Sequence, residues 1–140
     1  MVDTLTYIHS LLLAINKIDQ AFKAHFQTNN VLRAVRDKVI PKQGVFQING
    51  KRGSYHFHGI GCKVTMGNLI VNYDYTPPGV CGGFSLYDLH QYIQGRQGKC
   101  DLALLENELK QMVIQGLLVY PEAAPNRTLY FETAFWKSII

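Results

Sequence analysis

The sequence predicts a single α+β domain spanning residues 1–140, with an antiparallel β-meander flanked by N-terminal helices and C-terminal helices. Two observations predict this fold. Apolar residues recur at helical spacing on both sides of the centre of the chain, whereas residues 44–75 alternate between apolar and polar positions, as strands do. A chain of 140 residues with 47% hydrophobic and 17% charged residues is long enough and apolar enough to fold around one core without cross-links.

A long first helix is predicted over residues 4–27, with Asp3 or Thr4 placed to cap its start. Its apolar face is expected to hold Leu5, Ile8, Leu12, Ile15, Phe22 and Phe26. We expect Leu12, Ile15 and Phe22 to pack on the apolar face of the sheet. A second, short helix is predicted from Val31 to Val39, and it must stop before Pro41 because proline disfavours the helical state in the residue before it.

The meander is predicted to begin with a hairpin around the polar, basic turn at residues 49–54. Pairing Ile48 with Tyr55 and Phe46 with Phe57 would place four apolar side chains on one face of the sheet. His56 and His58 then fall on the opposite face, because successive side chains of a strand point to opposite sides.

A second hairpin is predicted around the two-residue turn Gly67-Asn68. Its register sorts the side chains cleanly and pairs Met66 with Leu69, Val64 with Val71, and Cys62 with Tyr73, all on one face. The apolar positions are odd-numbered at Tyr55 and Phe57 but even-numbered at Cys62 and Val64. We therefore expect a bulge or sharp bend at Gly59-Ile60-Gly61 to absorb the change.

The last third of the chain is predicted to be helical and to close with a short hairpin. Pro77-Pro78-Gly79 predicts a loop that continues through residues 81–83. Helices are expected to start at the N-caps Ser85 and Asp101, and Gly116 is a plausible end of the second one. Residues 117–120 and 128–131 then read as the two strands of the final hairpin, around a loop rich in Pro and Asn.

Composition narrows the setting in which the protein works. Three cysteines without a C-x-x-C spacing favour reduced thiols and a cytoplasmic location. No signal peptide is expected at the start of the sequence, and the apolar run at residues 11–15 is too short to span a bilayer. The net charge of +4 and the pI near 9.0 allow an acidic partner without requiring one.

Three segments of the chain carry a resemblance to a known family. They are Phe57-His58-Gly59-Ile60-Gly61-Cys62, Asn72-Tyr73-Asp74-Tyr75, and Gly83-Phe84-Ser85-Leu86-Tyr87-Asp88-Leu89. Over residues 44–95 the chain resembles small bacterial domains of unknown function that have an FHGxGC strand, a DFD-like strand and a GFDxxxL helix start. It departs from that pattern at Asn72 and Ser85, where acidic residues would be expected. Some members of the family resemble immunity proteins encoded near polymorphic toxins, so the resemblance implies a toxin-neutralising role.

The candidate binding residues are Lys51, Arg52, His56, His58 and Asp74. Lys51 and Arg52 lie between Gly50 and Gly53 and could hold an acidic side chain or a phosphate where cations and backbone amides converge. His56, His58 and Asp74 lie on the same predicted face and are the residues that would bind zinc if any did, since imidazole and carboxylate are ordinary zinc ligands. The other interpretations are an ordinary polar sheet face and a solvated basic surface.

Three functions follow from these residues as hypotheses. We expect a non-enzymatic domain that needs no cofactor and binds another protein, a toxin or related effector, because no catalytic triad, phosphate loop or strong metal motif is present. The first alternative is a nucleic-acid-binding protein, since the helix from Asp101 and the final hairpin resemble a winged helix. We expect weak binding at most, because Glu106 and Glu108 on that helix would repel phosphates. The second alternative is a zinc-dependent enzyme that uses His56 and His58.

Overall fold

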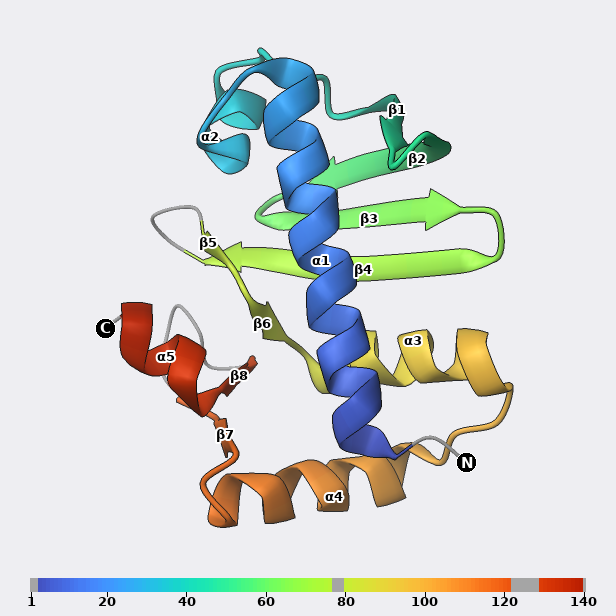
Figure 1. The fold of residues 1–140 in the computed structure, drawn as a ribbon, viewed down its shortest axis with the longest axis vertical. Helices are drawn as coiled ribbons and strands as arrows, with labels where there is room; N and C mark the ends of the chain where they lie inside the picture. Colours follow the sequence, from blue (N-terminus) through green and yellow to red (C-terminus); the bar gives the residue numbers. More distant parts are fainter. Residues whose placement is uncertain (1–2, 77–79, 122–128, 140) are drawn as a thin grey trace.

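The computed structural model describes residues 3–76, 80–121 and 129–139. In chain order the described elements are α1 (Thr4–Phe26), α2 (Val31–Arg36), β1 (Gln43–Ile48), β2 (Lys51–His58), β3 (Gly61–Met66), β4 (Leu69–Thr76), β5 (Val80–Cys81), β6 (Gly83–Phe84), α3 (Leu86–Gln97), α4 (Leu102–Ile114), β7 (Leu118–Val119), β8 (Tyr130–Glu132) and α5 (Thr133–Ile139). The predicted α+β fold is confirmed, with an antiparallel meander between N-terminal and C-terminal helices (Figure 1).

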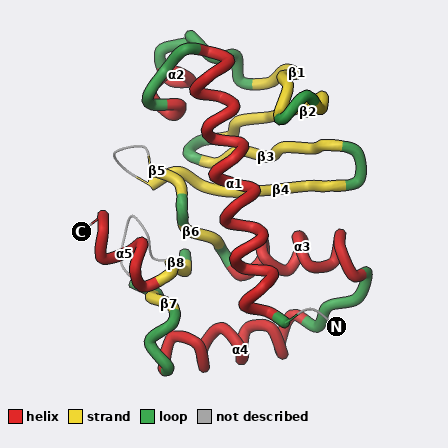
Figure 2. The backbone as a smooth tube through the Cα atoms, in the orientation of Figure 1, coloured by secondary structure: helices red, strands yellow, loops and turns green. Residues whose placement is uncertain are grey.

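The strands form two sheets. Strands β1 to β5 pair antiparallel in sequence order, and β6, β8 and β7 form a second, small sheet in that order. Helix α1 crosses one face of the larger sheet and continues down to α3 and α4 (Figure 2). The long helix thus connects the meander in one half of the molecule with the helices in the other half.

Helix α1 packs on the meander as predicted. Asp3 caps its start by accepting a hydrogen bond from the Thr6 amide. Phe22 lies at the centre of the contact, with its ring 4.2 Å from that of Phe46 and 5.1 Å from that of Tyr55. Ile15 is buried as expected, whereas Leu12 is only half-buried and its neighbour Leu11 takes the deeper position.

Helix α2 is shorter than predicted, because it ends at Arg36 instead of Val39. Lys38 adopts a left-handed backbone with φ of 62°, which breaks the helix. The amides of Val39 and Ile40 both turn back to the carbonyl of Ala34, so the chain closes on itself before Pro41. Ile40 is thereby buried in the core.

The second predicted hairpin is confirmed in every pair. Strands β3 and β4 pair Met66 with Leu69, Val64 with Val71 and Cys62 with Tyr73, and these side chains lie on the α1 side. Gly67 has φ of 58°, as the first central residue of a type II′ turn requires.

The predicted register of the first hairpin is wrong. Asn49 and Gly50 form the turn with φ of 51° and 79°, so Ile48 pairs with Lys51 and Phe46 with Gly53. Two positive φ values define a type I′ turn, which Asn-Gly favours more than other dipeptides. The apolar residues still share one face, because the observed register differs from the predicted one by an even number of positions and side chains alternate with period two.

Of the bulge or sharp bend expected between the two hairpins, the structure has the sharp bend, as a two-residue turn. His58 pairs with Gly61 across Gly59-Ile60, and Gly59 takes the positive φ of 62°. Antiparallel strands joined by a two-residue turn always pair odd-numbered with even-numbered positions. The change from odd to even apolar positions therefore needs no inserted residue.

The C-terminal elements agree in part with prediction. Ser85 and Asp101 cap α3 and α4, and after α4 the amides of Gly116 and Leu117 bond back to Val113 and Met112 in a Schellman motif. Strands β7 and β8 form the predicted hairpin. Residues 81–83 were expected to be loop, but Cys81 belongs to β5 and Gly83 to β6, and helix α5 was not predicted. The predicted loop at 77–79 and the hairpin loop at 122–128 lie outside the described residues.

Candidate functional site

The meander exposes one of its faces to solvent over β1, β2 and β3. Helix α1 covers the other face, and α3 lies against β4. The side chains that point away from α1 alternate with the buried ones along each strand. We call this surface the open face; its exposed members are Gln43, Val45, Gln47, Arg52, Ser54, His56, His58 and Lys63.

Two cations and two histidines give the open face its chemical character. The register places His56 directly across from Lys63, and Arg52 across from Gln47. The ring of His56 lies 5.8 Å from that of His58, both exposed on β2. Val45 adds an apolar side chain that is 47% exposed. The surface therefore combines positive charge, hydrogen-bond donors and one apolar contact point.

Lys51 and Arg52 do not converge as the sequence suggested. Both are exposed, but they are consecutive residues of β2, so their side chains leave the strand on opposite sides. Arg52 belongs to the open face, whereas Lys51 lies at the end of the strand next to the Asn49-Gly50 turn. The turn is also shorter than the six residues assigned to it, because it consists of Asn49-Gly50 alone.

His58 and Asp74 meet over a glycine. Gly61 pairs with His58 on one side and with Asp74 on the other. A Cβ atom at Gly61 would lie 2.7 Å from Asp74 Oδ1 and 3.0 Å from His58 Cε1, so the two side chains occupy the space that Gly61 leaves. Burial raises the pKa of Asp74, and His58 opposes that shift.

Asp88 at the start of α3 completes this polar group. Its amide donates a hydrogen bond of 3.1 Å to Ser85 Oγ. Burial raises the pKa of Asp88 to about 6, with the Ser85 hydroxyl opposing and the nearby Asp74 carboxylate adding to the shift. His58, Asp74 and Asp88 come one from each of the three segments that carried the family resemblance, and the fold brings these segments together.

The zinc site considered from the sequence is not formed. Among residues 3–76, 80–121 and 129–139, no three or more His, Cys, Asp or Glu side chains group together in a way that could hold a metal ion. His56 pairs with Lys63, one row away from the row that holds His58 and Asp74. His56, His58 and Asp74 are therefore not gathered into a metal-binding set.

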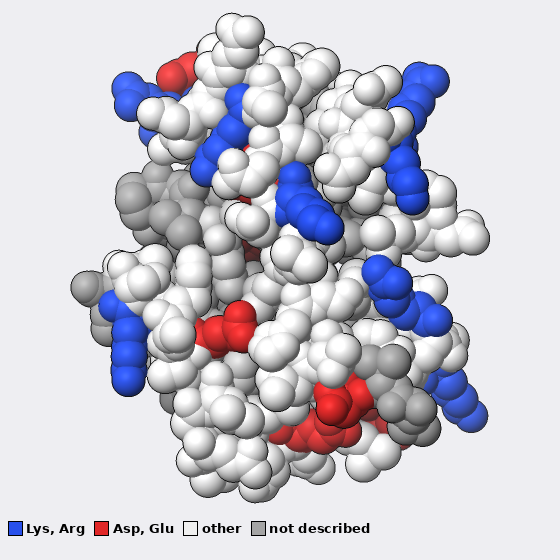
Figure 3. Space-filling model, in the orientation of Figure 1, with Lys and Arg blue, Asp and Glu red and all other residues white. Residues whose placement is uncertain are grey.

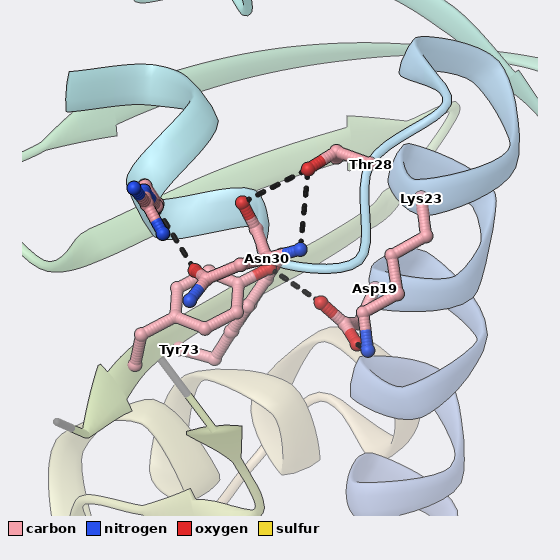
Figure 4. A network of polar contacts seen from close by, with 7 residues as sticks. Asp19, Lys23, Thr28, Asn30 and Tyr73 are labelled. Atoms are coloured by element: carbon pink, nitrogen blue, oxygen red, sulfur yellow. Dashed lines mark hydrogen bonds and ion pairs between the residues drawn. The ribbon is translucent and has the colours of Figure 1, made fainter. Parts of the chain in front are cut away.

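A buried polar network lies on the other side of the sheet and was missed from the sequence. Asp19 on α1 is only 5% exposed; its carboxylate lies 3.0 Å from Lys23 Nζ and accepts a hydrogen bond of 2.9 Å from the Tyr75 hydroxyl. The Tyr75 hydroxyl lies 3.2 Å from that of Tyr73. Figure 4 shows Asp19, Lys23 and Tyr73 of this network. An acidic residue among Ile15, Ile18 and Phe22 on an apolar helix face was the available signal. Because the carboxylate is paired, its position indicates a structural role.

The C-terminal elements have the order that the winged-helix resemblance predicted. Helices α3 and α4 are followed by the β7–β8 hairpin, and β8 pairs with the earlier strand β6. Helix α4 would be the recognition helix. Of the 13 described residues of α4, only Lys110 is Lys or Arg, and the Nζ atom of Lys110 lies 3.5 Å from Glu106. Glu108 accepts a hydrogen bond from the Thr4 hydroxyl.

The fold and the open face define a small α+β domain with an antiparallel meander that α1 covers on one face, while the opposite face is exposed over β1, β2 and β3. The chain belongs to the family described as Domain of unknown function (DUF6896), whose model matches residues 4–132. The match extends beyond the 44–95 range in which the sequence motifs lie. No curated protein and no solved structure matches the chain. Within the described residues, every helix is too short or too polar to cross a membrane.

Proposed function

We propose that this chain is a non-enzymatic, cytoplasmic protein-binding domain and that its partner is an acidic bacterial toxin or effector that it neutralises. The open face is the observation that carries the proposal. An uncovered antiparallel sheet face with Arg52, Lys63 and two histidines offers cationic and hydrogen-bonding groups to an acidic surface. The resemblance to immunity-like domains supports the neutralising role.

The charge distribution supports an acidic partner. Residues 17–63 hold nine Lys or Arg and two Asp or Glu, whereas residues 64–140 hold five and seven. On the face drawn in Figure 3, the acidic side chains gather mainly over the lower half of the molecule. A partner with negative charge is therefore steered toward the half that contains the meander, which raises the rate of encounter.

The described residues argue against a cysteine enzyme. Burial raises the pKa of Cys62 to about 12 and that of Cys81 to about 12. A catalytic thiol needs the opposite shift, because the thiolate is the nucleophile. These cysteines fit a packing role, which leaves the open face as the better candidate for function.

The test uses two charge reversals with the same change in net charge. The double variant Arg52→Glu/Lys63→Glu changes the open face, and Lys99→Glu/Lys137→Glu changes exposed positions in the other half. Each is co-expressed with the product of the neighbouring reading frame, and association is followed by surface plasmon resonance. The first variant should slow association by about tenfold at low salt, and the second should leave it unchanged. Equal effects, or no complex with the unchanged chain, would refute the proposal.

Nucleic-acid binding is the second candidate, favoured by the order of α3, α4, β7 and β8. We expect weak binding that comes from the basic stretch Arg33–Lys63 and not from α4. A salt titration with a duplex DNA probe measures it, since binding through phosphate contacts weakens steeply with salt. Tight, sequence-selective binding at physiological salt would make α4 the functional element and displace the protein-binding proposal.

A further inference from the structure

A groove separates helix α2 from the turn between β2 and β3. It has a volume of about 1040 Å³. Its apolar lining comes from both sides of the gap and consists of Leu32, Val35, Ile40, Pro41 and Ile60. Ile40 is buried at the bottom, whereas Ile60 at the tip of the turn is 45% exposed. A large apolar side chain that stays in water is a feature of surfaces that bind other molecules when it lies beside further apolar groups.

Four cations surround this lining, and we call the whole site the basic groove. They are Arg33, Arg36, Lys38 and Lys42. Asp37 is the acidic residue nearest in sequence; its carboxylate lies 3.8 Å from Arg33 Nε and 3.7 Å from Arg36 Nε. Pairs this long between exposed side chains contribute little, so most of the positive charge of the groove is available to a ligand.

The shape and chemistry of the groove favour an extended acidic segment over a small molecule. Sites for small molecules enclose most of the ligand, whereas the basic groove lies open between a short helix and a turn. An apolar lining with cations around it complements a peptide that has one large apolar side chain between carboxylates. The groove begins next to the end of β2, because His58 of the open face directly precedes Gly59, which lines the groove.

We infer that the basic groove binds an acidic segment of the partner protein and receives its apolar side chain. The inference rests on the proposed function for the identity of the partner as a protein. The segment passes from the open face around the Gly59-Ile60 turn, and its carboxylates pair with Arg36 and Lys42. The turn residue Ile60 packs against the inserted apolar side chain.

The probe is a short fluorescein-labelled peptide with a central leucine flanked by glutamates. Its binding to the full chain is measured by fluorescence anisotropy at low salt. Two matched peptides accompany it: one has serine in place of leucine, and the other has lysines in place of the glutamates. The acidic leucine peptide should bind at least about tenfold more tightly than either, because each control removes one of the two contributions.

Three variants assign the binding to the basic groove. Arg36→Glu/Lys42→Glu should weaken it by at least about tenfold, and Ile60→Ser by about fivefold since it removes apolar contact. Lys99→Glu/Lys137→Glu, which changes the net charge equally, should leave it unchanged. Thermal unfolding followed by circular dichroism confirms that all three remain folded; Ile60 is exposed in a turn, so its change should not disturb the core.

The outcomes separate this inference from the proposed function. Equal binding of the serine and leucine peptides, or equal affinity for the Arg36→Glu/Lys42→Glu variant, would overturn the groove assignment. In that case the effect of Arg52→Glu/Lys63→Glu on the whole partner would still decide whether the open face binds it. Tighter binding of a fluorescent fatty acid than of the leucine peptide would also overturn the inference, because it would identify a lipid site.

Discussion

At the scale of the residue, Asp88 is a carboxyl group whose pKa depends strongly on its surroundings. Its pKa is raised from 3.8 to about 6 because the carboxyl is partly buried where α3 meets the sheet. A folded pKa above the unfolded pKa means that ionisation favours unfolding. The contribution of Asp88 to stability is therefore greatest below its unfolded pKa and decreases as the pH rises through about 6.

Replacing Asp88 with asparagine tests this assignment. Asp88→Asn should raise the free energy of unfolding at about pH 7.5 by about 1 kcal/mol, a value reduced for partial exposure of the carboxyl. The gain should vanish near about pH 4, where the wild-type carboxyl is itself neutral. Urea unfolding at both pH values measures the difference. A variant that is less stable than the wild type at the higher pH would show that the carboxylate stabilises the start of α3.

Gly83 is a residue at which one added methyl group should destabilise the fold. A Cβ atom there would lie 2.7 Å from the ring of Phe131, which is buried in the core. Gly83→Ala should therefore destabilise the fold by about 1–3 kcal/mol. Gly95 is a matched control, since a Cβ atom there meets nothing within 4 Å on the exposed side of α3. Gly95→Ala should stabilise by about 0.5–1 kcal/mol; similar effects of both changes would contradict the packing described for β6 and β8.

At the scale of the element, the three tight turns set the register of the meander. The first of them requires positive φ at both Asn49 and Gly50. Gly50→Ala should destabilise the hairpin by about 1 kcal/mol, because a side chain is strained in the left-handed region. Asn49→Gly should be close to neutral. Chemical denaturation reports the stability of both; a harmless Gly50→Ala would favour the longer turn that the sequence first suggested.

The same turn shows how far sequence reasoning reached. The Gly67-Asn68 hairpin was predicted pair by pair, because a known turn type fixed its register and both strands alternated cleanly. The Asn49-Gly50 hairpin had an equally strong turn signal, but the polar stretch Lys51–Ser54 obscured it. Lys51 and Arg52 look like loop residues, and only pairing with β1 places them in a strand.

Other parts of the fold and site depend on contacts between distant segments. Strand β6 has two residues, and it exists because β8 pairs with it about 50 residues later in the chain. Asp88 joins His58 and Asp74 only after α3 has packed against β4. The side on which His56 and His58 lie was predictable from alternation alone. The exposure of that face over β1, β2 and β3 was not, because it depends on where α1 and α3 pack.

At the scale of the whole molecule, the uneven charge makes association with the partner depend on salt. The half that contains the meander carries most of the net positive charge. Raising the ionic strength from about 0.05 M to about 0.5 M should slow association strongly and change dissociation little, because screening acts mainly on the encounter. The Arg52→Glu/Lys63→Glu variant should lose most of this salt dependence. An association rate independent of salt would mean that apolar contacts alone guide the encounter.

Protection of lysines in the complex tests the central claim most directly. The free protein and its complex with the partner are treated with an acetylating reagent, and the modification of each lysine is quantified by mass spectrometry. We predict strong protection of Lys63 on the open face, together with Lys38 and Lys42 of the basic groove, while Lys99 and Lys137 react equally in both samples. Protection of Lys99 and Lys137 with free reaction of Lys63 would place the partner on the other half of the molecule and contradict the claim.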